Sequence, residues 1–138
     1  MAKVQVMIAA TSDGFFPSKE DRQLEWLRTD KRGFARWNEA SDRRLSTNEP
    51  LIDLICEKQR AENTAVYLAE ISDEESAGLL RGLFAYHLVD EIILYLLPFT
   101  VQSGVRAMEG FAPAEWKTVQ VRRYRNGICR VVYRKVLQ

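Results

Sequence analysis

A long apolar run in the second half of the chain constrains the fold most strongly. Glu91 to Phe99 is nearly continuous apolar sequence, preceded by Asp90 and interrupted by Pro98. A strand with one face in water alternates apolar and polar residues, whereas a strand covered on both faces does not. The run therefore predicts a strand at the centre of a sheet. It is too short for a membrane span, which needs about 20 apolar residues.

The spacing of apolar residues predicts further strands and helices around this one. Alternation and β-branched residues predict strands over residues 3–10, 64–68, 116–124 and 128–137. Helical spacing predicts helices over residues 20–28, 34–45, 50–61 and 72–84. Capping boxes beginning at Ser46 and Ser72 favour the starts of the last two helices. The dipeptide Asn126-Gly127 predicts a two-residue turn between the last two strands. Helices interleaved with strands, followed by a hairpin, indicate an α/β fold with a mixed sheet.

Composition is that of an ordinary globular protein. A chain of 138 residues is long enough to bury one core, and its hydrophobic fraction of 46% and charged fraction of 28% exclude a disordered or fibrous chain. Met1-Ala2-Lys3 runs directly into a strand pattern without a signal peptide, so a cytoplasmic protein is expected.

Cysteine and histidine positions do not predict a metal site or a thiol site. Cys56 lies on an apolar helical face and Cys129 in the last strand, without C-x-x-C spacing, so both are predicted to be small buried hydrophobes. The single histidine, His87, is predicted to lie in a loop. No metal ligand set is expected.

Charge is distributed unevenly along the chain. All 19 acidic residues lie at or before Glu115, and residues 116–138 hold seven bases and no acid. Such a basic hairpin could bind nucleic acid or an anion through the arginines at positions 122, 123, 125, 130 and 134. Alternatively, the arginines cover the solvent-exposed face of a strand pair. We favour the second interpretation, because no nucleic-acid-binding motif accompanies the charge.

Two segments far apart in the sequence resemble a known family. Met7 to Phe16 reads M-I-A-A-T-S-D-G-F-F, and Leu88 to Gly104 reads L-V-D-E-I-I-L-Y-L-L-P-F-T-V-Q-S-G. Together they resemble the first and late strands of the dihydrofolate reductase-like fold, closest to the C-terminal reductase domain of the bifunctional deaminase-reductases of riboflavin synthesis. Leu24 to Leu27 and the closing hairpin support the resemblance. It implies a mixed, mainly parallel sheet flanked by helices with a C-terminal antiparallel hairpin, as one domain over residues 1–138, shortened between about 28 and 64.

The resemblance also implies a cofactor and a substrate. Enzymes of this family pass a hydride from NADPH to a pterin or a ribosylaminopyrimidine, and the protein must hold and orient both molecules. Ala10 and Ser12 occupy the small-residue positions where a nicotinamide lies on the first strand. Asp13 could orient the substrate or handle a proton. It could equally form an Asx-type turn with Gly14, and both interpretations remain open.

The family's pyrophosphate position differs most from this sequence. The family has a Gly-Gly pair that leads into a helix N-terminus, where backbone amides hold phosphate. This chain has Ala69-Glu70, followed by Ser72 and then by three acids, Asp73 to Glu75, in the first helical turn. Those carboxylates satisfy the helix dipole themselves and would repel a diphosphate.

The family's grip on the cofactor's 2′-phosphate is also altered. A Gly-Arg-x-Thr stretch is replaced by Arg43 and Arg44 ahead of Thr47, and a cofactor-binding strand and helix of the family are expected to be missing between residues 28 and 64. Arg43 and Arg44 are therefore candidate but unorthodox phosphate contacts.

Two functional hypotheses follow. We favour a diverged member of the reductase family with a degenerate cofactor site, which binds a pterin- or pyrimidine-like small molecule or acts as a homodimer. The alternative is an active NADPH-dependent reductase that uses unorthodox phosphate contacts. NADPH is expected as a cofactor only if the family activity is retained, and neither a membrane nor a nucleic acid is an expected partner. Four aromatic residues are candidates for a dimer interface or for plain core: Tyr95, Phe99, Tyr124 and Tyr133.

Overall fold

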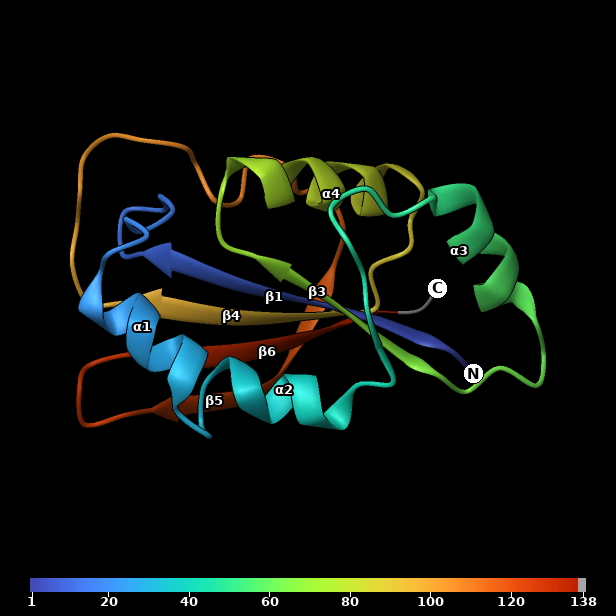
Figure 1. Cartoon of the computed structure of the whole chain (residues 1–138), viewed down its shortest axis with the longest axis horizontal. Helices are drawn as coiled ribbons and strands as arrows, with labels where there is room; N and C mark the ends of the chain where they lie inside the picture. Colours follow the sequence, from blue (N-terminus) through green and yellow to red (C-terminus); the bar gives the residue numbers. More distant parts are fainter. Residues whose placement is uncertain (137–138) are drawn as a thin grey trace.

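A computed structural model, which describes residues 1–136, contains a six-stranded sheet between two layers of helices (Figure 1). The strands are β1 (Lys3–Thr11), β2 (Arg43–Arg44), β3 (Val66–Ile71), β4 (Glu91–Leu97), β5 (Trp116–Arg123) and β6 (Cys129–Lys135). The helices are α1 (Arg22–Thr29), α2 (Phe34–Ala40), α3 (Leu51–Gln59) and α4 (Glu74–Ala85).

The strand order is β2-β3-β1-β4-β6-β5. The pairs from β2 to β4 are parallel, and β6 is antiparallel to both β4 and β5. The predicted mixed α/β sheet with a C-terminal antiparallel hairpin is therefore confirmed. So is the interior place of the apolar strand, since Ile93 and Leu94 in β4 are 0% and 6% exposed.

Each face of the sheet has its own apolar core. Along β1, Ile8 and Ala10 pack with α3 and α4, while Met7 and Ala9 pack with α1 and α2. Figure 1 shows the two helix pairs on opposite sides of the sheet. Because successive side chains of a strand point to opposite faces, a strand buried on both sides loses its polar alternation.

The predicted helix over residues 34–45 is wrong beyond Ala40. The backbone becomes extended at Ser41, and Arg43–Arg44 form β2 beside β3. The carboxylate of Asp42 accepts a hydrogen bond from the Val66 amide at 2.7 Å, and the Leu45 amide donates to the Leu68 carbonyl at 2.8 Å. These pairings with residues more than 20 positions away outweigh the local preference for helix.

Neither Ser46 nor Ser72, the first residues of the two predicted capping boxes, is the N-cap of a helix. Glu49 does accept from the Ser46 amide at 3.2 Å, but this closes a turn, and α3 begins after Pro50. In α4 the N-cap is Asp73 rather than Ser72, and Ser76 completes the box.

The hairpin turn is one residue longer than predicted. Tyr124 and Ile128 form the last backbone pair, so three residues, Arg125 to Gly127, make the loop. Gly127 alone among them has a positive φ, +91°. The Asn126 side chain accepts from the Ile128 amide at 3.1 Å, which holds the longer loop.

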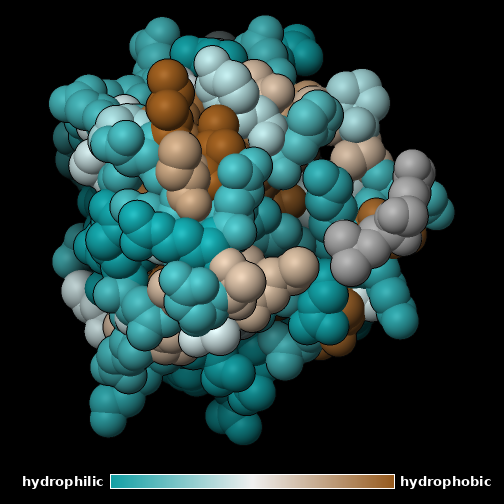
Figure 2. Space-filling model, turned by 90° about the vertical axis from the view of Figure 1, so that its right-hand side faces the viewer, coloured by the Kyte–Doolittle hydropathy of each residue, from teal (hydrophilic) through white to brown (hydrophobic). Residues whose placement is uncertain are grey.

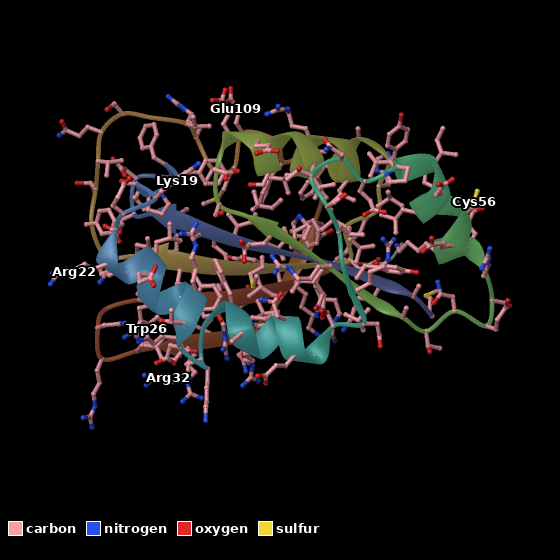
Figure 3. All side chains as sticks on the ribbon, viewed as in Figure 1. Lys19, Arg22, Trp26, Arg32, Cys56 and Glu109 are labelled. Atoms are coloured by element: carbon pink, nitrogen blue, oxygen red, sulfur yellow. The ribbon has the colours of Figure 1, made fainter. Side chains whose placement is uncertain are left out.

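Cys56, which was predicted to be buried, is exposed, and Arg130, which was predicted to face solvent, is buried. Cys56 is exposed on α3 (Figure 3), so the prediction of a buried thiol is wrong there, while Cys129 is half-buried. Arg130 is 1% exposed, so it does not lie on a solvent-exposed strand face. Its guanidinium donates to Gln120 at 2.7 Å and lies over the rings of Trp37 and Tyr124.

His87 lies in a loop, as predicted. In the described part of the chain, no helix combines the length and apolarity of a membrane span.

Candidate functional site

The loop after β1 is held by side-chain hydrogen bonds to neighbouring segments. The Ser12 hydroxyl donates to the Leu97 carbonyl at 2.7 Å, which ties the loop to the end of β4. The Asp13 carboxylate accepts from the Gln102 amide at 2.8 Å and from the Val101 amide at 3.2 Å. Asp13 therefore has a structural role in joining two loops at this edge.

Hydrogen bonds keep the Asp13 carboxyl ionised. The Thr11 hydroxyl donates to it at 2.6 Å, and this bond, with the Gln102 and Val101 amides, lowers the pKa of Asp13. An exposed carboxylate with a lowered pKa is suited to accept a hydrogen bond from a ligand rather than to deliver a proton. Its role toward a substrate stays a prediction.

Ala10 and Ala69 are enclosed by the protein's own side chains. Both are 0% exposed and belong to the core beneath α4. The strand β3 extends to Ile71, so Ala69 and Glu70 lie within it, and Ala69 is opposite Val6 in the middle of β1. The strand was predicted to end at residue 68, and its true end places Ser72 and Asp73 at the position that leads into the helix.

The N-terminus of α4 is capped by the chain itself. The Asp73 carboxylate accepts from the Ser76 amide at 2.8 Å. The Ser76 hydroxyl accepts from the amides of Ser72 at 3.0 Å and Asp73 at 3.1 Å. Three backbone N–H groups that could hold a phosphate are thus already hydrogen-bonded. The next two residues of this turn are both glutamates, Glu74 and Glu75.

Two cations lie near this helix end. Partial burial acts to raise the pKa of Asp73, but hydrogen bonds from Ser76 and the positive charges of Lys19 and Arg28 lower it overall. Figure 3 shows Lys19 at the same end of the molecule as the start of α4. No sequence pattern could place these two residues near Asp73, because they come from the loop after β1 and from α1.

The two candidate arginines on β2 are already paired with acids. Arg44 lies 3.5 Å from Glu70, so the structure brings these two predicted site residues together. Arg43 lies 3.1 Å from Glu49 and 3.6 Å from Glu57. Neighbouring residues of a strand point to opposite faces, so Arg43 and Arg44 do not form one cluster.

An open cavity of about 360 Å³ lies at the edge formed by the carboxyl ends of the parallel strands. Asp13, Gly14, Arg106, Met108 and Glu109 line it. Of the residues predicted for the site, Asp13 lines this cavity, whereas Ala10, Ser12, Ala69, Glu70 and Ser72 do not. Within residues 1–136, no group of three or more His, Cys, Asp or Glu side chains is placed to hold a metal ion.

Comparisons with known proteins identify the fold. No protein-family model and no curated protein sequence matches the chain. Solved structures do match, and they share the dihydrofolate reductase-like fold of riboflavin-pathway reductase-like proteins. The resemblance stated from the sequence is confirmed at this level.

Three solved structures illustrate the similarity. A protein assigned to riboflavin biosynthesis from Shewanella sp. PV-4 is 12% identical with a TM-score of 0.56, and the match covers 98% of this chain and 99% of that one. RibD of Acinetobacter baumannii is 15% identical with a TM-score of 0.61, over 99% of this chain and 59% of that one. A Thermotoga maritima deaminase and 5-amino-6-(5-phosphoribosylamino)uracil reductase is 13% identical with a TM-score of 0.53, over 97% and 56%. The chain spans somewhat more than half the length of the last two proteins.

Proposed function

We propose that this chain is a diverged protein of the riboflavin-pathway reductase fold with a degenerate dinucleotide site, and that it binds a pterin- or pyrimidine-like small molecule or acts as a homodimer. The capping of α4 carries this proposal. The side chains of Ser76 and Asp73 accept hydrogen bonds of 2.8 to 3.1 Å from three backbone amides, those of Ser72, Asp73 and Ser76. A diphosphate would have to displace these hydrogen bonds. It would also approach three carboxylates at the helix end where anions otherwise bind well.

The enclosure of the two alanines supports the same proposal. A nicotinamide on the end of β1 needs open space above small residues, and of its two positions Ala10 has no exposed surface whereas Ser12 is exposed. Ala69, at the pyrophosphate position, has no exposed surface either. Opening that space would uncover part of the core under α4, at about 25 cal/mol for each Å² of apolar surface returned to water.

The alternative function is an active NADPH-dependent reductase with unorthodox phosphate contacts. Lys19 and Arg28 favour it, because both place positive charge near Asp73 at the start of α4. The arginines of β2 support it less, since both are paired with acids.

Titration of the purified protein with NADPH tests the proposal. We expect no saturable change in NADPH fluorescence and no rise in melting temperature. A ligand at 100 times its dissociation constant stabilises the folded state by about 2.7 kcal/mol, which a thermal scan detects easily. Saturable binding in the micromolar range would instead support the active reductase.

A charge-neutral variant shows which feature blocks the cofactor. Asp73→Asn, Glu74→Gln and Glu75→Gln together remove three negative charges, while asparagine caps a helix as well as aspartate does. If charge alone prevents binding, this variant gains affinity for NADPH. Adding Ser76→Ala then frees the Ser72 and Asp73 amides. Continued failure of both variants points to the enclosed surface at Ala10.

A further inference from the structure

An open cavity of about 400 Å³ lies at the amino ends of the parallel strands, the edge opposite to Asp13 and Ser72. Residues from α3, from the segment after α4 and from the start of the chain line it, among them Ile55, Lys58, Tyr86, His87 and Leu88. Figure 2 faces this end of the molecule and shows apolar residues surrounded by hydrophilic ones. The volume falls within the range of about 300 to 1,000 Å³ that is usual for small-molecule pockets.

The lining of this amino-edge cavity combines an apolar wall with hydrogen-bond donors. Ile55 and Leu88 supply apolar surface, while Lys58, Tyr86 and His87 supply an ammonium, a phenol and an imidazole. No aspartate or glutamate is among the lining residues. The one acid beside this lining, Asp90, is neutralised by its ion pair with Lys58, so the donors of the cavity suit a ligand whose acceptor oxygens, such as those of a carboxylate, project from an apolar body.

Lys58 is fixed in place before any ligand arrives. Its ammonium lies 2.9 Å and 3.1 Å from the two oxygens of Asp90, and Asp90 also accepts from the Val4 amide at 2.8 Å. The Lys58 side chain keeps 19% of its surface exposed. An ammonium has three protons, and the Asp90 carboxylate takes at most two, so one donor remains for a ligand.

His87 occupies a backbone position that favours glycine. Its φ is +55°, and it ends α4 in a left-handed cap, with the Leu88 amide donating to the Leu83 carbonyl at 2.9 Å. Glycine adopts this conformation without steric strain, whereas histidine does not. The imidazole is exposed and lies on the rim of the cavity, so the strained residue places a donor where a ligand would need one.

We propose that the amino-edge cavity binds a small organic carboxylate, with the apolar body against Ile55 and Leu88 and the carboxylate oxygens near Lys58 and His87. This inference rests on the small-molecule part of the proposed function, but it names a different site from the one at the carboxyl ends of the strands. Occupation of one edge does not require an intact dinucleotide site at the other.

The probes for this proposal are benzoate and its neutral isostere benzamide. We expect benzoate to shift amide resonances of residues 55–59 and 86–88 in a saturable manner, and benzamide to bind at least about tenfold more weakly. Equal affinity for the two probes, or shifts confined to residues around Asp13 and Arg106, would overturn the proposal. Excess NADPH should leave the benzoate shifts unchanged, so the outcome of the cofactor titration remains separate.

Substitution of His87 separates a binding role from a capping role. His87→Gly relieves the positive φ and should raise the melting temperature by about 3 °C. We expect the same variant to bind benzoate at least about fivefold more weakly, whereas the affinity would stay unchanged if His87 only capped α4. Lys58→Met should abolish the preference for benzoate over benzamide, whereas Arg60→Met, which removes a charge from the end of the same helix, should preserve it. Unchanged benzoate affinity in His87→Gly and Lys58→Met would refute the site.

Discussion

At the scale of single residues, two glycines share one backbone conformation in different surroundings. Gly14 has a φ of +90° and Gly127 a φ of +91°. A Cβ added at Gly14 would meet nothing within 4 Å, whereas one at Gly127 would lie 2.8 Å from Cγ of Pro98. The pair therefore separates the cost of the left-handed conformation from the cost of a steric clash.

Replacing each glycine by alanine should give unequal losses of stability. We expect Gly14→Ala to reduce the free energy of unfolding by about 1 kcal/mol, the usual penalty of the left-handed region for a residue with a Cβ. Gly127→Ala should cost about 1 kcal/mol more, because the hairpin loop must also move away from Pro98. Urea unfolding of both variants measures the difference. Equal losses would mean that the loop yields without cost.

At the scale of the elements, a buried carboxylate joins three strands. Glu91 of β4 is 4% exposed. It accepts from Gln5 at 2.8 Å, lies 3.0 Å from Lys3 in β1, and accepts from Arg134 of β6 at 3.1 Å. Burial acts to raise the pKa of Glu91, but the partners in β1 and β6 together hold it below its ordinary value of 4.5.

Glu91→Gln should remove an acid-sensitive part of the stability. Because the pKa is lower in the folded chain than in the unfolded one, the stabilisation is fully present above about pH 4.5 and is lost as the pH falls through the folded value. We expect a loss of about 2 kcal/mol at pH 7, from hydrogen bonds to a charged group. Chemical unfolding at pH 7 and pH 3.5 should show the two proteins converging in acid. A constant difference at both pH values would contradict this account.

The elements that sequence reasoning predicted best are those with strong periodic patterns. The apolar run of β4 and the helical spacing of α4 identified both elements, because a strand buried on both faces is apolar throughout and a helix buried on one face is apolar on every turn. The strand β2 was missed, since two arginines carry no strand pattern and pair with β3 through backbone bonds. The three-residue loop was missed because Asn126-Gly127 suits more than one turn type.

The candidate site was less predictable than the fold, because much of it depends on contacts between residues far apart in the sequence. Asp73 and the acids after it could be recognised, since helix-start patterns are local. The Ser76 hydroxyl that takes the Ser72 amide, and the pairing of Arg44 with Glu70, depend on rotamers and on contacts across the sheet. Sequence spacing does not specify either.

At the scale of the whole molecule, the sheet ends in an edge strand with little cover. Residues 117–123 of β5 are all exposed, and Val119 and Val121 are 37% and 57% exposed. By contrast, Tyr95 and Tyr124, which were candidates for a dimer interface, are 0% and 9% exposed and belong to the core. An edge strand with unpaired backbone groups is suited to pairing with a second chain.

We therefore expect a homodimer that uses β5 of both chains. Analytical ultracentrifugation of the purified protein should show a dimer, and Val121→Glu should shift it to the monomer by placing a charge in the apolar part of the interface. Ile52→Glu is the matched control, because Ile52 is 73% exposed on α3, on a different element from β5. That control should leave the dimer intact. A monomeric parent protein, or a dimer that resists Val121→Glu, would show that β5 is covered in another way or remains a free edge.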